Sequence, residues 1–100
     1  MEGRRVQPEV KHLEKPGDYF PVYQEDGTTI KWLWFALPNN GQWGRIAAKG
    51  GGNGEEPEWT ITEDEAGRIT VDPSIDTGPM LIRGTDCSYH GHLTAGVWNP

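Results

Sequence analysis

The sequence predicts an all-β protein: a small single-domain sandwich or partly open barrel of short antiparallel strands. Stretches rich in aromatic and β-branched residues recur along the chain, and turn residues separate them, with 14 glycines and 8 prolines in 100 residues. No window sustains the 3.6-residue hydrophobic repeat that is typical of an amphipathic helix. A chain of this length corresponds to one domain with a small core.

The N-terminal segment and the first strands differ in character. Residues 1–17 are expected to form an extended or flexible arm, because prolines at positions 8 and 16 disfavour helix at the residues before them. The β domain is expected to span residues 18–100. Its first strand is predicted at 18–23, where Pro21 favours an edge position because proline cannot donate a ladder hydrogen bond.

The next part of the chain contains the most hydrophobic stretch, residues 28–37, which follows the hairpin signal Asp26-Gly27. Both of its faces become apolar, which predicts a central strand, and a return strand is expected at 43–48. Core packing is favoured for Trp32, Trp34 and Trp43 over an aromatic ligand platform, because a small domain needs large rings inside. Residues 49–56 are rich in glycine and predict a mobile loop.

In the C-terminal half of the chain, apolar and polar residues alternate, which predicts further strands. A hairpin is predicted from strands at 58–62 and 68–71, with Trp59, Ile61, Ile69 and Val71 facing the core. Shorter strands are expected at 80–82 and 89–93, and residues 96–98 are expected to close the sheet.

The charge and the single cysteine exclude several classes of function. The net charge is −6 and the basic residues are scattered, so we expect no nucleic-acid partner. No apolar run approaches the ~20 residues of a membrane span, so no membrane association is expected. One cysteine cannot form an intrachain disulfide, which indicates a reducing compartment.

A family resemblance rests mainly on residues after position 57. The residues that carry it are Trp59, Thr60, Ile61, Pro73, Ser74, Ile75, Cys87, His90, Gly91, Leu93, Gly96, Val97 and Trp98. With them the chain resembles a family of small uncharacterised phage and prophage proteins, some of which carry the automatic label "ammonia monooxygenase", an artefact. The resemblance implies a phage-type protein located in the host cytoplasm or the virion.

The run that contains Cys87, His90 and His92 is the candidate metal site, because zinc takes cysteine sulfur and histidine nitrogen. It offers three ligands, and His12 or Asp86 would have to supply the fourth. Members of the resembled family often carry a cysteine-rich knuckle after the first hydrophobic strand, whereas residues 37–43 of this chain contain no cysteine. A buried thiol beside hydrogen-bonding histidines is therefore favoured, with no cofactor expected and zinc as the alternative.

The same run also suggests a catalytic alternative. A Cys/His pair needs an activated thiolate and an orienting third group, for which Asp86 or Asp76 is available.

The leading functional hypothesis is a non-enzymatic, phage-type accessory or virion-associated protein that acts by binding another protein. The expected partner is a phage structural protein or a host protein, and a homo-oligomer is possible. The competing hypothesis is a zinc-binding or thiol-dependent enzyme centred on Cys87, His90 and His92.

Overall fold

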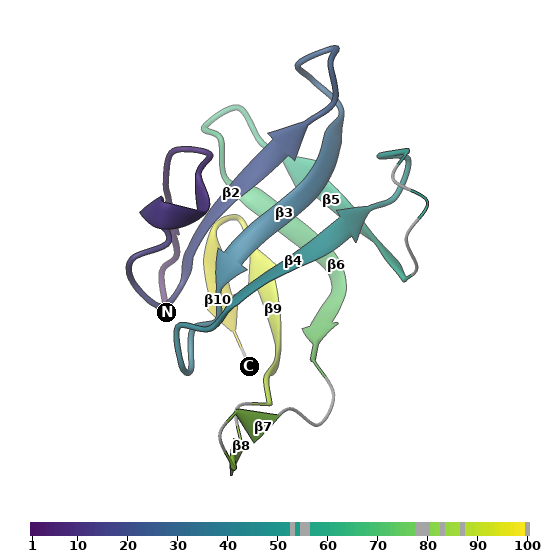
Figure 1. Ribbon diagram of the computed structural model, residues 1–100. Coiled ribbons are helices and arrows are strands. Elements are labelled where there is room, and N and C mark those ends of the chain that lie inside the picture. Colours follow the sequence, from purple (N-terminus) through teal and green to yellow (C-terminus); the bar gives the residue numbers. More distant parts are fainter. Residues whose placement is uncertain (53, 55–56, 78–80, 83, 87, 100) are drawn as a thin grey trace.

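Eight strands form one curled sheet in the computed structural model, which describes residues 1–52, 54, 57–77, 81–82, 84–86 and 88–99 (Figure 1). The strands are β1 (Arg4–Arg5), β2 (Asp18–Tyr23), β3 (Ile30–Ala36), β4 (Trp43–Ala48), β5 (Glu58–Glu63), β6 (Ile69–Asp76), β7 (Leu81–Ile82), β8 (Thr85–Asp86), β9 (His90–Thr94) and β10 (Val97–Asn99). The order in the sheet is β1-β2-β3-β4-β5-β6-β9-β10, while β7 pairs with β8. The all-β prediction is confirmed.

Most neighbouring strands run antiparallel, as expected, but β1 with β2 and β4 with β5 are parallel. The N-terminal residues connect the two ends of the sheet order. The backbone N–H of Gly3 donates to the carbonyl of Gly96 at 2.7 Å, and Glu2 forms an isolated bridge with Val97. Because β1 then pairs with β2, residues 2–5 lie between β10 and β2 and bring the sheet close to a barrel.

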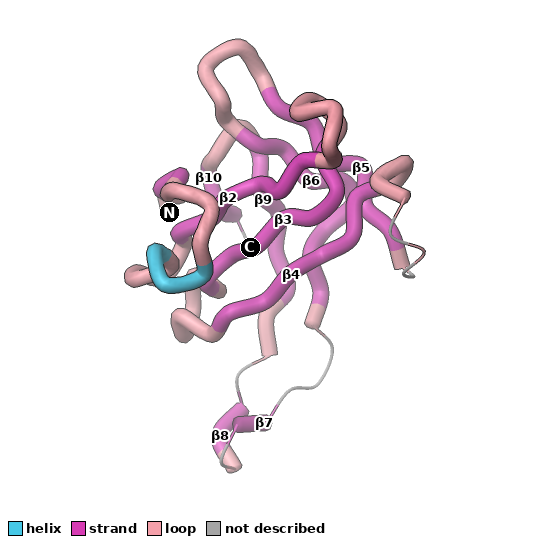
Figure 2. The backbone as a smooth tube through the Cα atoms, turned by 45° about the horizontal axis from the view of Figure 1, so that its top comes forward, coloured by secondary structure: helices cyan, strands magenta, loops and turns pink. Residues whose placement is uncertain are grey.

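The interior of this curled sheet is filled by alternate side chains from all the long strands. Its buried members are Tyr19, Ile30, Leu33, Phe35, Leu37, Ile46, Ala48, Ile69, Val71, Ile75, Leu93 and Trp98. A second, smaller cluster of Leu13, Phe20 and Ala36 lies outside β2 and β3. The arm supplies Leu13, which follows the one-turn 3-10 helix η1 (Val10–His12), and Figure 2 shows η1 beside the N-terminal strands.

Two details of the prediction hold only in part. Trp43 is 49% exposed, and Trp32 is half-buried on the outer face, where the guanidinium of Arg45 lies 4.1 Å from its ring centroid. Trp34 is half-buried and packs against the second cluster. The interior side of β3 is already occupied by Leu33 and Phe35. Strand β2 lies between β1 and β3, so it is not an edge strand over its whole length. However, β1 pairs only with its first two residues, so among the described residues Pro21 itself pairs with β3 alone, which agrees with the predicted edge position of this proline.

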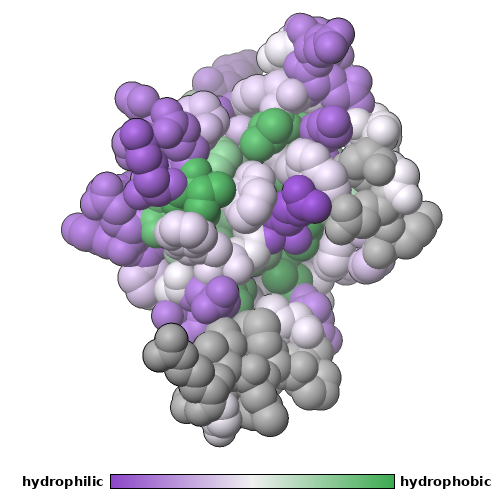
Figure 3. All heavy atoms as spheres, in the orientation of Figure 1, coloured by the Kyte–Doolittle hydropathy of each residue, from purple (hydrophilic) through white to green (hydrophobic). Residues whose placement is uncertain are grey.

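Some expectations fall on residues outside the described ranges. Three residues of the glycine-rich loop (53, 55 and 56) are among them, so the mobility of this loop stays a prediction. Cys87 also lies outside the described residues. Within the described residues, no helix has the length and apolar character needed to cross a membrane. Figure 3 shows the face that carries β2, β3 and β4, where hydrophobic surface forms only small patches among polar side chains.

An ion pair between the exposed side chain of Arg4 and the buried carboxylate of Asp18 fixes the start of β2. The carboxylate of Asp18 is 1% exposed and accepts two hydrogen bonds from Arg4, at 3.0 and 2.8 Å. Burial acts to raise the pKa of Asp18, but hydrogen bonds from Arg4 and from the backbone N–H groups of Lys15 and Glu14 outweigh it. The pKa of Asp18 is therefore lower than its ordinary value, and its ionised form stabilises the fold.

We expect stability to fall in acid partly because of Asp18. A carboxyl with a lowered pKa in the folded state contributes stability above its unfolded pKa of ~3.9, and this contribution is lost as the pH falls toward the folded pKa. Urea unfolding between pH 7 and pH 2 should show that Asp18→Asn is less stable at pH 7 and loses less below about pH 4. If the free energies of unfolding of the wild-type protein and Asp18→Asn fell in parallel as the pH was lowered, this role of Asp18 would be excluded.

Candidate functional site

Strand β6 continues past the point where the sequence predicts its end. The strand was predicted only at residues 68–71, yet β6 extends to Asp76. Its ladder with β9 is interrupted between Val71 and Ile75, and the Asp72–Pro73 peptide bond within this interruption is cis. Ser74 lies in the interrupted stretch, which in the sequence runs between the buried residues Val71 and Ile75. Irregularities of this kind re-aim side chains and are frequent next to functional sites.

Strand β9 presents two histidines on the same outer face. In the His90-Gly91-His92 sequence, Gly91 faces the interior, and a Cβ atom there would lie 2.6 Å from the carbonyl oxygen of Asn99 and closer still to the hydroxyl of Tyr89. Only glycine fits this position. His90 and His92 therefore point outward, with their ring centroids 6.3 Å apart.

The two strands bring a serine hydroxyl and an imidazole together. Ser74 Oγ lies 3.1 Å from His90 Nε2, within hydrogen-bonding distance. The indole N–H of Trp59, on β5, donates to the carbonyl oxygen of Ser74 at 3.0 Å, which holds the backbone at this point. Asp76 is the cross-strand partner of His90 in the β6–β9 ladder. Beyond it, Thr77 and Tyr89 exchange backbone and hydroxyl hydrogen bonds that fix the register.

This arrangement suits acyl-transfer chemistry. A serine hydroxyl is a weak nucleophile until a neighbouring base accepts its proton, and 3.1 Å to an imidazole nitrogen is the geometry that such a transfer needs. Ser74 is half-buried and His90 is exposed, so a substrate can reach the pair from solvent. An acidic residue at the position of Asp76 can orient the imidazole, as in serine hydrolase triads.

The sequence-predicted site is thus brought together in part. His90 and His92 share one face, as expected for alternate residues of a strand, whereas Cys87 lies outside the described residues. Over the described ranges, no group of three His, Cys, Asp or Glu residues is arranged to hold a metal ion. A zinc ion held by Cys87, His90 and His92, the alternative to the favoured metal-free interpretation, stays untested. His12 ends η1, in the N-terminal arm.

Sequence reasoning named Ser74 as part of the family resemblance and missed it as a site residue. Two signals were available. The chain has only two serines, Ser74 and Ser88, and the outward positions 72, 74 and 76 form a polar alternation that continues the predicted strand at 68–71. Extending that strand through Pro73 would have placed Ser74 opposite the histidines.

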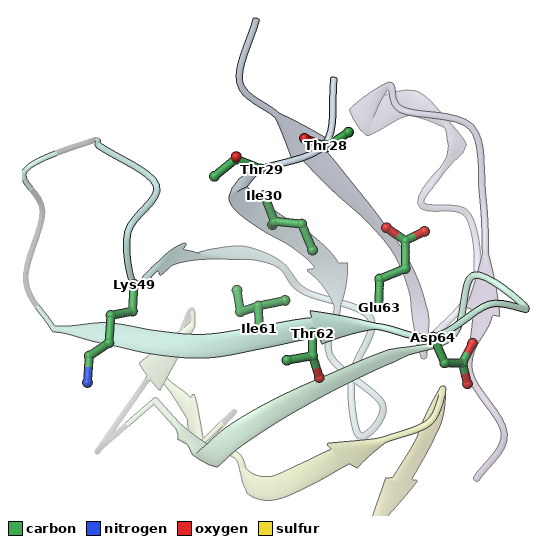
Figure 4. A pocket seen from close by; sticks show the side chains of 8 residues that line it. All are labelled: Thr28, Thr29, Ile30, Lys49, Ile61, Thr62, Glu63 and Asp64. Atoms are coloured by element: carbon green, nitrogen blue, oxygen red, sulfur yellow. The ribbon is translucent and has the colours of Figure 1, made fainter. Parts of the chain in front are cut away.

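A larger hollow lies elsewhere, between the start of β3 and the end of β5 (Figure 4). It measures about 550 Å³ and is lined by Thr28, Thr29, Ile30, Lys49, Ile61, Thr62, Glu63 and Asp64. Its polar groups are engaged in local structural contacts. The hydroxyl of Thr29 donates a hydrogen bond to the carboxylate of Asp26. Glu63 forms a salt bridge with Arg5 at 2.6 Å, and Asp64 forms one with Arg68 at 2.8 Å. We therefore place the candidate site at Ser74 and His90.

Comparison with known protein families matches residues 5–100 to the family described as "Bacterial ubiquitination-like system serine protease (BubE)". The match covers nearly the whole chain. The protein belongs to this family. No curated protein sequence and no solved structure gives a significant match.

The family membership corrects the functional hypothesis. The family is described as a serine protease, so the predicted non-enzymatic, virion-associated accessory role is wrong, and so is the prediction that the chain is not an enzyme. The resemblance to a small family is confirmed at the level of a bacterial family, but the match shows neither a phage link nor the label "ammonia monooxygenase". A role in a ubiquitination-like system agrees with the expectation of a protein partner.

Proposed function

We propose that the chain is a serine protease in which Ser74 is the nucleophile and His90 the general base. The observation that carries this proposal is the 3.1 Å contact between Ser74 Oγ and His90 Nε2 in a member of a serine protease family. The indole N–H of Trp59 donates a hydrogen bond to the carbonyl of Ser74, which holds the backbone of the nucleophile in place.

In the proposed reaction, Ser74 Oγ attacks the carbonyl carbon of the scissile bond while its proton passes to His90 Nε2. The tetrahedral intermediate then collapses, the bond to the leaving group breaks, and His90 returns the proton to that group. The product is an ester between Ser74 and the substrate acyl group. Water, deprotonated by His90, hydrolyses this ester and restores the hydroxyl of Ser74.

We infer that Asp76 orients His90. Directly opposed residues of antiparallel strands have Cβ atoms about 4.5–5.5 Å apart, which is close enough for a carboxylate to contact a neighbouring imidazole. The carboxylate would also stabilise the imidazolium that forms during acylation. Asp76→Asn should lower kcat by ~10²-fold or more and leave KM and the melting temperature nearly unchanged. An unchanged kcat would assign the orienting role to another group.

The substrate class follows from the family and from the shape of the site. Ser74 is half-buried and His90 is exposed, so an extended polypeptide segment can approach both residues from solvent. The family description names a ubiquitination-like system, so we propose that a protein of that system supplies the cleaved bond. This replaces the earlier expectation of a phage structural or host partner.

The role of His90 is tested with p-nitrophenyl acetate, an activated ester that reports acylation without sequence recognition. We expect His90→Ala to lower the rate of p-nitrophenol release by ~10²–10⁴-fold, the usual contribution of a general base. His92→Ala is the matched control, since His92 lies on the same strand face and does not contact Ser74 in the proposed mechanism. Equal rates for His90→Ala and the wild-type protein would refute the assignment.

A further inference from the structure

The outer face on which Ser74 and His90 lie carries an unbalanced negative charge. Its strands, β5, β6 and β9, are consecutive in the sheet (Figure 1). The side chains at their outward positions are those of Glu58, Thr60, Thr62, Thr70, Asp72, Ser74, Asp76, His90, His92 and Thr94. Three of these side chains are acidic, and none belongs to lysine or arginine. At a pH where its histidines are neutral, this face is therefore negative.

The basic side chains belong to other parts of the fold. Within the described ranges, lysines and arginines lie in the N-terminal arm, on β1, β3 and β4, and in the segments that follow β4 and β5; they are Arg4, Arg5, Lys11, Lys15, Lys31, Arg45, Lys49 and Arg68. Three of the arginines form ion pairs with carboxylates outside the site face. No outward position of β5, β6 or β9 is thus occupied by a permanent positive charge.

Two carboxylates of this face lie two residues from Ser74, and they differ in their partners. Asp76 already has an interaction partner. Asp72 is exposed, and among the described residues its carboxylate takes part in no hydrogen bond or ion pair. Its cross-strand neighbour on β5, Thr60, is uncharged. The charge of Asp72 is therefore available to a ligand.

Asp72 is close enough to Ser74 to meet a substrate that Ser74 attacks. Two residues of backbone span at most ~7 Å, whatever their conformation. An extended substrate advances ~3.3 Å per residue, so a side chain next to the cleaved bond lies within reach of the Asp72 carboxylate.

We propose that Asp72 is a specificity-determining residue that selects a positively charged side chain next to the scissile bond. The proposal rests on the proposed function and names the substrate class of that site. A lysine or arginine side chain is attracted by Asp72, whereas an acidic side chain is repelled by it and by the negative face around it. The substrate is then a segment of a partner protein with a basic residue beside the cleaved bond.

The expected preference is moderate, because Asp72 is exposed. A pair of exposed opposite charges changes an equilibrium constant by about 1.5- to 5-fold. Attraction of a cation and repulsion of an anion act in opposite directions, so the two effects multiply in the ratio of the two substrates. Salt reduces this ratio, since the Debye length falls from ~30 Å at 0.01 M to ~3 Å at 1 M.

The preference is measured with the p-nitrophenyl esters of N-acetyl-lysine and N-acetyl-glutamate. At pH 8 both substrate side chains are charged and imidazoles are neutral. The rate with Ser74→Ala is subtracted as background hydrolysis. We expect kcat/KM for the lysine ester to exceed that for the glutamate ester at least 5-fold in 10 mM salt and less than 2-fold in 1 M salt.

Variants of Asp72 assign the preference to this residue. Asp72→Asn should lower the lysine-to-glutamate ratio at least 3-fold, and Asp72→Lys should invert it. Glu65→Gln is the matched control, because it removes the same charge from an exposed position in the turn before β6; we expect it to keep the wild-type ratio. A ratio unchanged by Asp72→Asn, or lowered equally by Glu65→Gln, would overturn the proposal.

Binding to Ser74→Ala separates failure of this proposal from failure of the proposed function. The probes are blocked tripeptide amides with lysine or glutamate between two glycines, titrated into the protein and followed by ¹H–¹⁵N spectra. Preferential binding of the lysine peptide that Asp72→Asn abolishes, together with a wild-type protein that hydrolyses neither ester, would retain the role of Asp72 and refute the serine protease assignment. Hydrolysis that depends on Ser74, at equal rates for the two esters, would retain the assignment and refute the role of Asp72.

Discussion

Replacing Ser74 with alanine is expected to lower kcat at least ~10³-fold, because loss of the nucleophile removes the covalent pathway and leaves only the binding interactions. The hydroxyl of Ser74 contacts His90 on a solvent-facing side of the sheet, so its removal should change the melting temperature by no more than a few degrees. The measurement is the steady-state release of p-nitrophenol alongside a thermal melt of the same sample.

The other serine provides the matched control. Ser88→Ala also removes one hydroxyl, and the hydrogen bond that the Asn39 amide donates to the carbonyl of residue 88 is retained. We expect Ser88→Ala to keep wild-type kcat. If Ser88→Ala lost activity while Ser74→Ala kept it, the nucleophile would have been assigned to the wrong serine.

Replacing Trp98 with alanine is expected to destabilise the fold by ~3–5 kcal/mol, the usual cost of truncating a large buried aromatic residue. Trp98 is 2% exposed, its ring meets those of Phe35 at 5.9 Å and Tyr89 at 6.0 Å, and its indole N–H donates to the Gly17 carbonyl at 2.9 Å. The truncation therefore leaves a cavity, and the Gly17 carbonyl keeps only the longer hydrogen bond, of 3.4 Å, that it accepts from the backbone N–H of Arg4.

Chemical unfolding of Trp98→Ala measures this loss, with His92→Ala as the comparison. The His92 side chain is exposed, so its removal should cost less than ~1 kcal/mol. Equal, small losses in the two variants would show that Trp98 contributes little to the core. Trp98 belongs to the main core cluster, whereas His92 lies on the outer face, so a clear difference between the two variants is expected.

The strands were predictable because local signals agree with the fold. Alternation in residues 58–62 and 68–71 places Ile69 and Val71 inside, and both are buried in the structure. The part of the N-terminal residues in closing the sheet was not predictable, because the bonds of Gly3 and β1 join segments far apart in sequence and follow no periodic pattern. The exposure of Trp43 was missed for a related reason: hydrophobicity favours burial, while the exposure of a strand residue depends on which strands pair, and among the described residues Trp43 pairs with β3 alone.

The site was predictable only in its histidine half. His90 and His92 were expected on one face because side chains repeat every two residues in a strand, and the structure places them so. The position of Ser74 on a strand was not predicted, because it follows Pro73 and proline usually ends a ladder of strand hydrogen bonds. In the structure Pro73 lies where the ladder is interrupted, so β6 can continue and bring Ser74 against His90. A contact of this kind depends on register across two strands, which one sequence does not reveal.

Covalent labelling with a fluorophosphonate tests the pairing of Ser74 with His90 most directly, because this reagent reacts with a serine that a neighbouring base has activated. Peptide mapping by mass spectrometry identifies the labelled residue. We expect one phosphonyl group on Ser74 of the folded protein, formed at least 10²-fold more slowly in His90→Ala and at the wild-type rate in His92→Ala. Labelling of Ser88 instead, or labelling of Ser74 that is unaffected by the loss of His90, would contradict the assignment.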